Sequence, residues 1–552
     1  MTYQFTYHRH FFWAFALFLI ALKLLLVSDI EVHLRFSPFD DNVYVSRAYS
    51  FLTDGNWGSY DAYTLAKLPG MSYWLVSSRL LGIPYLLGIN ILYCFAGLLL
   101  IHAASNAGVS KQILLITYVV YLCNPVTFSI GWALVMREAL SSVITVALLG
   151  VSLLILISPK NKLPFGWIFC WALLFSFCQL LREEDRLLWI FLIMFGCIAV
   201  WLRRDSASNK INYAFTIVLF TLPSMLTTFA GHFVRNHNET NYGAAILSDY
   251  NEGEFPMLMA AIRSIDSPVD NRLVMLSQEV IQVLRIHVPE FIPVLDRLPS
   301  PGFQTYSCKL QGVCSEWSNG WMPWWVKQAS YDAGLTSSLA EGQAYFKMVR
   351  VHIEGLCGAR ILTCKPNGQG IIPPMELRWF RPFIHELSRI TAMLISPNIE
   401  LVSADSQTIT AARVLIMKYQ IVTMTNFIEN RFLSDKNTDT LVTAQEGWRR
   451  SLALIDAFVI AVVIVLGSIA LIWRWMMYPG VPASPVVNLC VVFWVYSVFK
   501  LLALSYVAVF FGPFESRIVF ASHIGLSVLG IFVISDTIQA HHKFHSMRYF
   551  RA

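Results

Sequence analysis

Residues 139–157 read ALSSVITVALLGVSLLILI, a run of 19 residues without a charged side chain. An α-helix rises about 1.5 Å per residue, so about 20 mainly apolar residues cross the hydrocarbon core of a bilayer. This stretch therefore predicts a membrane-spanning helix.

Similar apolar segments recur along the chain, and an even number of them would place both ends on the same side of the membrane. The first segment contains Lys23 and no small-residue cleavage site follows it, so we interpret it as an uncleaved anchor. The sequence predicts an α-helical polytopic membrane protein. The ten segments that qualify are 11–30, 86–104, 112–130, 139–157, 164–181, 186–202, 211–231, 452–473, 486–511 and 517–537.

The composition agrees with a membrane protein. Of the 552 residues, 56% are hydrophobic and 14% are charged, and the mean hydropathy is +0.55, whereas a soluble domain carries about 25% charge. A soluble protein, a disordered chain and a disulfide miniprotein are excluded. The net charge of +6 is spread over loops and tails, which indicates membrane topology and no nucleic-acid partner.

Basic residues in short loops set the predicted orientation, because cytoplasmic loops are enriched in Lys and Arg. The basic short loops all fall on the cytoplasmic side only if residues 68–84 do not cross the membrane. We expect a short helix at the outer interface there. The basic residues that then face inward are Arg9, Lys111, Lys160, Lys162, Arg203, Arg204, Lys210, Arg474, Lys543, Arg548 and Arg551.

The opposite, outer side receives the longer polar pieces. We predict an N-terminal transmembrane module, residues 1–231, whose first outer loop (31–67) is acidic, and a C-terminal module with a cytoplasmic tail, residues 451–552. Between them, residues 232–450 are long enough for a folded extracytoplasmic domain. Apolar spacing near 3.6 residues predicts that this domain is mainly helical.

Four of the ten cysteines, Cys308, Cys314, Cys357 and Cys364, fall in the outer region, and the other six fall inside predicted spans. An even set in an oxidising compartment predicts two disulfides. The simplest pairing joins 308 with 314 and 357 with 364, although four cysteines allow three pairings. Four free thiols are the alternative. The spacing disfavours structural zinc.

Two adjacent carboxylates, Asp40 and Asp41, lie in the first outer loop just before a helix predicted from about Val43. Either one could cap that helix. Two carboxylates exceed what a cap needs, and one of them could act as a general base toward an acceptor hydroxyl if its neighbours keep it ionised.

Further ionisable groups fall on the same predicted face, where charged side chains are costly and become candidates for a site. Lys67 ends the first loop, where it could snorkel to the interface or bind a lipid phosphate. The remaining charges are expected to pair with one another and with the first loop. They are Arg137, Glu138, Arg182, Glu183, Glu184, Asp185, Arg186, Glu515 and Arg517.

Motifs for other chemistry are absent from the sequence. It contains no Walker motif, no dinucleotide fingerprint, no zinc-protease helix and no nucleophile elbow. We assign no cofactor and no metal, with a divalent ion left open.

Three stretches give the sequence a family resemblance. Residues 39–45 (FDDNVYV) with 60–70 (YDAYTLAKLPG), residues 136–140 (MREAL), and residues 181–185 (LREED) are similar to the acidic first loop and the Arg-Glu motifs of bacterial GT-C integral-membrane glycosyltransferases. Short stretches of the outer region, around Glu254, Trp321 and Glu341, resemble the same largely uncharacterised group. This group is related to the mannosyl and aminoarabinose transferases.

The resemblance implies an enzyme that takes a monosaccharide, a hexose or a pentose, from a polyprenyl-phosphate donor. The acceptor would be a cell-envelope glycan or glycolipid such as lipopolysaccharide, on the periplasmic face of a bacterial inner membrane. Asp40 or Asp41 would be the base, and Lys67, Arg137 and Arg182 would bind the departing phosphate. Supporting roles would fall to Glu138, Glu183, Glu184, Asp185 and Arg517.

Three other functions stay open. A transporter or flippase for a lipid-linked sugar would be expected to show two related halves with broken spans, and we find no such symmetry. An O-antigen polymerase or ligase would act on the same face with a lipid-diphosphate donor. A non-enzymatic sensor or assembly protein could also carry a large outer domain.

Overall fold

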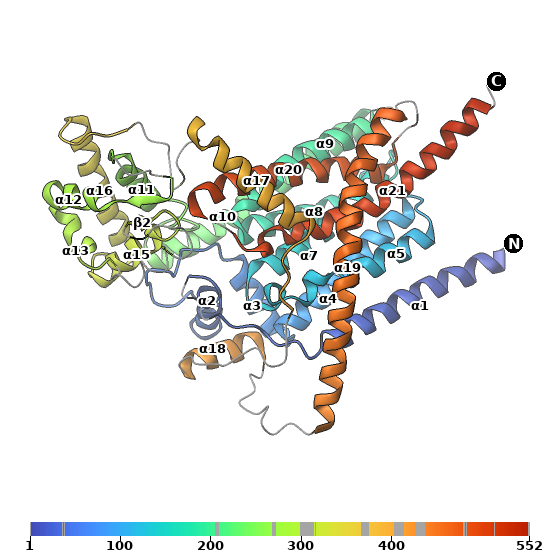
Figure 1. Cartoon of the computed structure of the whole chain (residues 1–552), viewed down its shortest axis with the longest axis horizontal. Coiled ribbons are helices and arrows are strands. Elements are labelled where there is room, and N and C mark those ends of the chain that lie inside the picture. The colour runs from blue at the N-terminus through green and yellow to red at the C-terminus, as the bar shows by residue number, and fades with distance from the viewer. Residues whose placement is uncertain are drawn as a thin grey trace.

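The computed structural model of the chain describes most of its length (Figure 1). The described residues are 2–35, 37, 39–204, 209–267, 272–298, 308, 314, 316–365, 372, 375–401, 413–425, 436–478, 481, 483–512 and 514–549.

Helices dominate this structure. In the first half of the chain they are α1 (Thr2–Leu26), α2 (Asp41–Asp54), α3 (Gly70–Leu80), α4 (Tyr85–Asn106), α5 (Lys111–Leu122), η1 (Pro125–Phe128), α6 (Ile130–Ala133), α7 (Arg137–Ile157), α8 (Phe165–Leu181), η2 (Glu183–Leu187), α9 (Leu188–Arg203), α10 (Asn209–Tyr242) and α11 (Glu254–Ser264). In the second half they are α12 (Gln278–His287), η3 (Pro289–Phe291), α13 (Ile292–Leu295), α15 (Met322–Asp332), α16 (Leu339–Gly358), η4 (Leu377–Trp379), α17 (Phe380–Ile395), α18 (Arg413–Thr423), α19 (Lys436–Met477), α20 (Pro485–Phe511), η6 (Ser516–Val519) and α21 (Phe520–Tyr549).

Eight described helical stretches are long and apolar enough to cross a membrane, which confirms a helical polytopic membrane protein. The two other predicted segments, 11–30 and 164–181, correspond to shorter apolar helices, Phe12–Leu26 and Phe165–Leu181. Residues 68–84 form only the 11-residue helix α3, which is too short to span. The eight stretches are Tyr85–Asn106, Lys111–Phe128, Arg137–Ile157, Glu183–Arg203, Lys210–Tyr242, Ala444–Met477, Pro485–Phe511 and Ser516–Phe544.

The predicted span 112–130 is a broken helix in the structure. Helix α5 ends at Leu122, and η1 and α6 follow as separate short helices. Pro125 has no N–H to continue the α-helical ladder. The side chain of Asn124 instead accepts a hydrogen bond from the backbone N–H of Val126 at 3.1 Å and caps η1.

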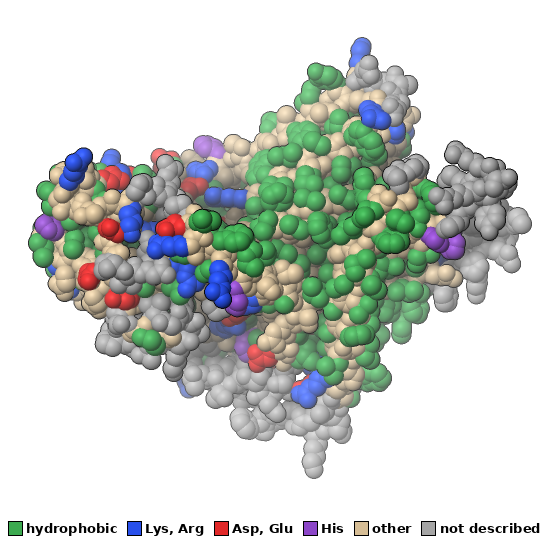
Figure 2. All heavy atoms as spheres, turned by 45° about the horizontal axis from the view of Figure 1, so that its top comes forward, with side chains coloured by type: hydrophobic (Ala, Val, Ile, Leu, Met, Phe, Trp, Pro, Cys, Tyr) green, Lys and Arg blue, Asp and Glu red, His purple; other side chains and the backbone are tan. Residues whose placement is uncertain are grey.

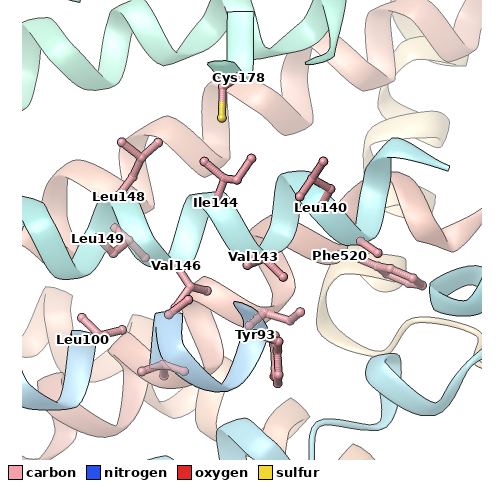
Figure 3. Close-up of a cluster of buried hydrophobic side chains, with 14 of the residues drawn as sticks. Tyr93, Leu100, Leu140, Val143, Ile144, Val146, Leu148, Leu149, Cys178 and Phe520 are labelled. Carbon is pink, nitrogen blue, oxygen red and sulfur yellow. The ribbon is translucent and has the colours of Figure 1, made fainter. Parts of the chain in front are cut away.

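Helix α7 lies at the centre of the bundle and packs against α4, α8, α20 and α21. Its side chains at Leu140, Val143 and Ile144 are buried among neighbours that include Tyr93 and Cys178 (Figure 3). This explains why the sequence stretch that first predicted a span has no polar face, since a helix surrounded by other helices is apolar all round.

A second hydrophobic core lies beyond one end of the bundle. It is built from residues 255–362, chiefly of α11, α12, α15 and α16. The one sheet among the described residues belongs to it, where β1 (Val274–Leu276) pairs antiparallel with β2 (Trp317–Ser318). Two disulfides, Cys308–Cys314 and Cys357–Cys364, confirm the simplest predicted pairing.

The membrane bundle and the second core differ in the side chains on their surfaces. Charged side chains gather over the second core, whereas apolar side chains cover the bundle (Figure 2), as on α19, where Leu454 and Phe458 are exposed. Both ends of the chain lie at the end of the bundle away from the second core (Figure 1). Helices α17 and α18 contribute to the core of the bundle through Ile390, Leu394 and Tyr419. The domain limits at 231 and 451 stay a prediction.

Candidate active site

The predicted site residues come together at the end of the bundle that faces the second core. Three connections between helices meet there, because Arg137 begins α7, residues 182–187 join α8 to α9, and Arg517 lies between α20 and α21. The N-terminus of α2 completes the cluster with Asp40 and Asp41.

Asp41 organises the first loop. It is fully buried, and its two carboxylate oxygens accept hydrogen bonds from the backbone N–H groups of Arg35 at 3.0 Å and Ser37 at 2.8 Å. Tyr419 of α18 lies beside it, and burial together with this carboxylate raises the pKa of the Tyr419 phenol. The loop therefore folds back onto Asp41, and its carboxylate is occupied by structural contacts.

Asp40 faces the cations instead. It occupies the N-cap position of α2 but makes no capping hydrogen bond with its side chain. One carboxylate oxygen lies 3.5 Å from Nζ of Lys67 and the other lies 4.0 Å from Nη2 of Arg517. With 31% of its side chain exposed, Asp40 is the carboxylate of the pair that a ligand can reach.

The charges around Asp40 keep it ionised. Burial acts to raise the pKa of the Asp40 carboxyl, but Lys67, Arg517 and Arg137 outweigh it, and the pKa lies below its ordinary value. Opposite charges within about 4–6 Å favour the ionised form of a carboxyl group in this way. Asp40 thus meets the condition that a general base must be ionised at neutral pH.

Lys67 is positioned by a buried arginine. Arg47 of α2 is 3% exposed and donates hydrogen bonds to the carbonyl oxygens of Lys67 at 2.8 Å and Tyr63 at 3.3 Å. The ammonium of Lys67 also lies 5.0 Å from the ring centroid of Trp324, in α15 of the second core. Both contacts hold Lys67 toward Asp40.

Arg137 and Arg182 are each paired with a glutamate of the connection between α8 and α9. Arg137 forms an ion pair with Glu183, and Arg182, which is 1% exposed, forms one with Glu184. Asp185 lies deeper, where it accepts a hydrogen bond from the Ser141 hydroxyl at 3.3 Å. These pairs satisfy the charges that would otherwise be costly to bury.

Arg517 links the two sides of the cluster. Its guanidinium lies 3.5 Å from Glu138, 4.0 Å from Asp40 and 2.8 Å from Glu515, and Glu515 in turn pairs with Arg35 at 2.7 Å. A single arginine therefore connects the start of α21 to the start of α7 and to the first loop.

A close backbone contact aligns two of the motifs. Gly70, which begins α3, packs against the backbone at Leu180 and Leu181, directly before Arg182. A Cβ atom at Gly70 would lie 2.6 Å from the carbonyl oxygen of Leu180. Only glycine permits this approach, which fixes the Lys67 segment relative to the Arg182 segment.

The structure adds residues that the sequence reasoning missed. Lys500 of α20 is buried 4.0 Å from Asp185, and its position as a lone charge in an apolar span was a usable signal. The three guanidinium nitrogens of Arg263 in α11 are buried and have no hydrogen-bond partner in the described part of the chain. No sequence pattern marked Arg263 or Arg47.

Among the residues that the structure describes, no group of three or more His, Cys, Asp and Glu side chains is arranged to hold a metal ion.

Comparison with known proteins gives a distant structural similarity. No family model matches the sequence, and no curated protein matches it. A solved structure, ArnT from Cupriavidus metallidurans bound to undecaprenyl phosphate, is 12% identical to this chain at a TM-score of 0.28, and the match covers 95% of this chain and 78% of that one. At this identity and TM-score, the function has to be argued from the geometry of the site.

Proposed function

We propose that this protein is an inverting membrane glycosyltransferase of the GT-C type. It transfers a monosaccharide, a hexose or a pentose, from a polyprenyl-phosphate donor to a glycan or glycolipid acceptor of the cell envelope. The observation that carries the proposal is the position of Asp40, an ionised and partly exposed carboxylate 3.5 Å from Lys67 and 4.0 Å from Arg517 at one end of a membrane bundle.

In this proposal Asp40 is the general base. It removes the proton from an acceptor hydroxyl while that oxygen forms a bond to the anomeric carbon of the donor sugar. The bond between the anomeric carbon and the phosphate oxygen breaks, and its electron pair leaves with the polyprenyl phosphate. A single displacement of this kind inverts the anomeric carbon.

The cations stabilise the leaving phosphate. Lys67 and Arg517 are the two nearest to Asp40. Arg137 and Arg182 belong to the same cluster, and ion pairs with Glu183 and Glu184 hold them in place. Fixed charges aimed at a developing anion are usually the largest catalytic contribution, since they need no reorganisation during the reaction.

The proposed orientation places this end of the bundle and the second core outside the cytoplasm. The basic loops at Lys111, Lys160 and Arg474 support it, because cytoplasmic loops are enriched in Lys and Arg. The two disulfides also support it, since such bonds persist in oxidising compartments. We expect the inner membrane of a bacterium.

A transfer assay tests the proposal. Full-length protein in detergent is incubated with radiolabelled polyprenyl-phosphate sugars and an envelope glycolipid extract. Asp40→Asn should lower the transfer rate by about 10²–10⁴-fold, the contribution typical of a general base. Asp41→Asn should act mainly by destabilising the first loop, because Asp41 accepts hydrogen bonds from Arg35 and Ser37.

Asp54→Asn is the matched control, since Asp54 lies exposed at the far end of the same helix. It should transfer sugar at the wild-type rate. Full activity of both Asp40→Asn and Asp41→Asn would reject the assignment of a base in this loop.

A further inference from the structure

A pocket lies beside the cluster of charges, between α2, residues 57–64 and α18. Its cavity volume is about 180 Å³, below the range of about 300–1,000 Å³ for drug-sized ligands, so it can hold only a small group. None of the eight stretches that could span the membrane contributes to its wall. It is therefore suited to a polar group.

Hydroxyl and amide groups dominate the wall. Asn42, Ser46 and Ser50 line the pocket from one face of α2, at intervals of four residues, and Ser59 and Thr64 line it from the loop. A hydroxyl group both donates and accepts hydrogen bonds. This lining complements a ligand that itself carries several hydroxyl groups.

Charged groups from three elements border the same space. The Oδ1 atom of Asp61 accepts hydrogen bonds from the backbone of Tyr63 and the hydroxyl of Thr64, both at 2.8 Å, so this side chain has a fixed orientation. Lys418 of α18 lines the pocket, and its ammonium lies 5.6 Å from the ring centroid of Tyr49. The Nε atom of Arg47 is buried without a hydrogen-bond partner among the described residues.

The pocket shares a wall with the proposed active site. Arg47 lines the pocket and donates to the carbonyl oxygen of Lys67. Tyr63, another lining residue, has its ring centroid 5.2 Å from that of Phe39, the neighbour of Asp40. Asp40 does not line the pocket itself, and the pocket is connected to it through Arg47 and Tyr63, which contact its neighbours Lys67 and Phe39.

We propose that this pocket binds the saccharide of the acceptor. The inference rests on the proposed function, in which a general base must contact the acceptor, and Asn42 of the pocket follows Asp40 by two residues in the chain. The donor phosphate belongs with Lys67, Arg517 and Arg137. A pocket lined by hydroxyl groups, without an apolar groove, fits a sugar and not a lipid chain.

Filling the pocket tests the inference. In full-length protein, Ser46→Phe fills it from α2, and Ser59→Trp fills it from the exposed loop in case the first variant does not fold. Transfer is measured at varied concentrations of the glycolipid extract and, separately, of the polyprenyl-phosphate sugar. We expect the KM for the acceptor to rise about tenfold, the loss of one or two hydrogen bonds, while the KM for the donor is unchanged.

The control is Thr53→Phe, because Thr53 lies exposed on the same helix and outside the pocket. It should change neither constant. A rise in the donor KM alone, or an unchanged acceptor KM in a folded pocket-filling variant, would overturn the inference and leave the proposed transfer reaction standing.

A binding measurement decides the case in which no transfer is found. Saturation-transfer NMR with methyl glycosides of hexoses and pentoses, and with inorganic phosphate as an anion probe, needs no turnover. Glycoside signals in the wild type that persist in Asp40→Asn and vanish in Ser59→Trp would support the pocket although the proposed function had failed. Signals from phosphate alone, or from no probe, would overturn it.

Discussion

The ammonium of Lys67 lies 3.5 Å from a carboxylate oxygen of Asp40. Together with Arg517 and Arg137 it outweighs the effect of burial and lowers the pKa of the Asp40 carboxyl. The pKa of Asp40 is therefore lower in the folded protein than in the unfolded chain. Its carboxylate stabilises the folded protein fully at pH values above the unfolded pKa. This stabilisation is lost as the pH falls through the folded pKa.

Lys67→Met should therefore move the acid limb of the pH–rate profile to higher pH. Removing the Lys67 ammonium raises the pKa of Asp40 toward its ordinary value, so the proposed base becomes protonated at a higher pH. The measurement is the transfer rate between pH 3 and pH 8, with the midpoint of thermal unfolding followed over the same range. Lys347→Met is the control, because Lys347 is an exposed lysine of α16. If the acid limb of Lys67→Met does not differ from that of the wild type, Lys67 does not lower the pKa of Asp40.

Gly70→Ala should damage the site without touching any charged group. The added Cβ would lie 2.6 Å from the carbonyl oxygen of Leu180, so α3 and the end of α8 must move apart. Overpacking of this kind costs about 1–3 kcal/mol, and displacement of Lys67 relative to Arg182 should lower the transfer rate further. Thermal unfolding and the transfer assay measure the two effects.

Gly166→Ala is the matched control, because no atom lies within 4 Å of a Cβ placed at Gly166 of α8. It should be neutral or slightly stabilising, since alanine is the better helix former. Equal behaviour of the two variants would show that the contact at Gly70 does not align the site.

The residues of the cluster were predictable from the sequence, whereas the separate roles of Asp40 and Asp41 were not. Lys67 ends the first outer loop, and Arg137 and Arg182 border apolar segments, so membrane topology alone puts the three positions on one face. Choosing between Asp40 and Asp41 requires the path of residues 35–37, which fold back to donate to Asp41. Local spacing holds no information about that contact.

Contacts between residues close in sequence were predictable, whereas contacts that depend on tertiary packing were not. Cys308 pairs with Cys314 and Cys357 with Cys364 because cysteines separated by six or seven residues meet with little loss of chain entropy. The partners of Arg47, by contrast, are backbone carbonyls of the loop between α2 and α3. They depend on the rotation of a helix about its axis, and periodicity does not determine it at that precision.

The disulfides predict a simple labelling result. Under denaturing conditions without reductant, six of the ten cysteines should react with an alkylating agent, because six are free. Reduction should expose four more. Cys357→Ser with Cys364→Ser should destabilise the protein by about 2–3 kcal/mol, the value for a short closed loop, and ten labels before reduction would contradict both the pairing and the proposed compartment.

A buried ion pair should join the second core to the first loop. Asp249 and Lys327 are 3% and 2% exposed and bind each other. Asp249 also accepts a hydrogen bond from the Tyr60 hydroxyl at 3.0 Å, and its backbone N–H donates to the carbonyl oxygen of Leu65 at 3.1 Å. Lys327→Met leaves an uncompensated buried carboxylate, so it should destabilise the protein by about 3–5 kcal/mol.

The exposed pair Arg285–Asp296 is the control, with side chains 35% and 54% exposed, and Arg285→Met should cost no more than about 1 kcal/mol. The double variant Lys327→Met with Asp249→Asn should be less destabilised than Lys327→Met alone, since it removes the unpaired charge. Thermal unfolding of the wild type, Lys327→Met, Asp249→Asn and the double variant measures this coupling. The pair anchors residues 60–66 next to Lys67, so Lys327→Met should also lower the transfer rate. A Lys327→Met variant that unfolds at a lower temperature but transfers sugar at the wild-type rate would show that the ion pair contributes to stability alone.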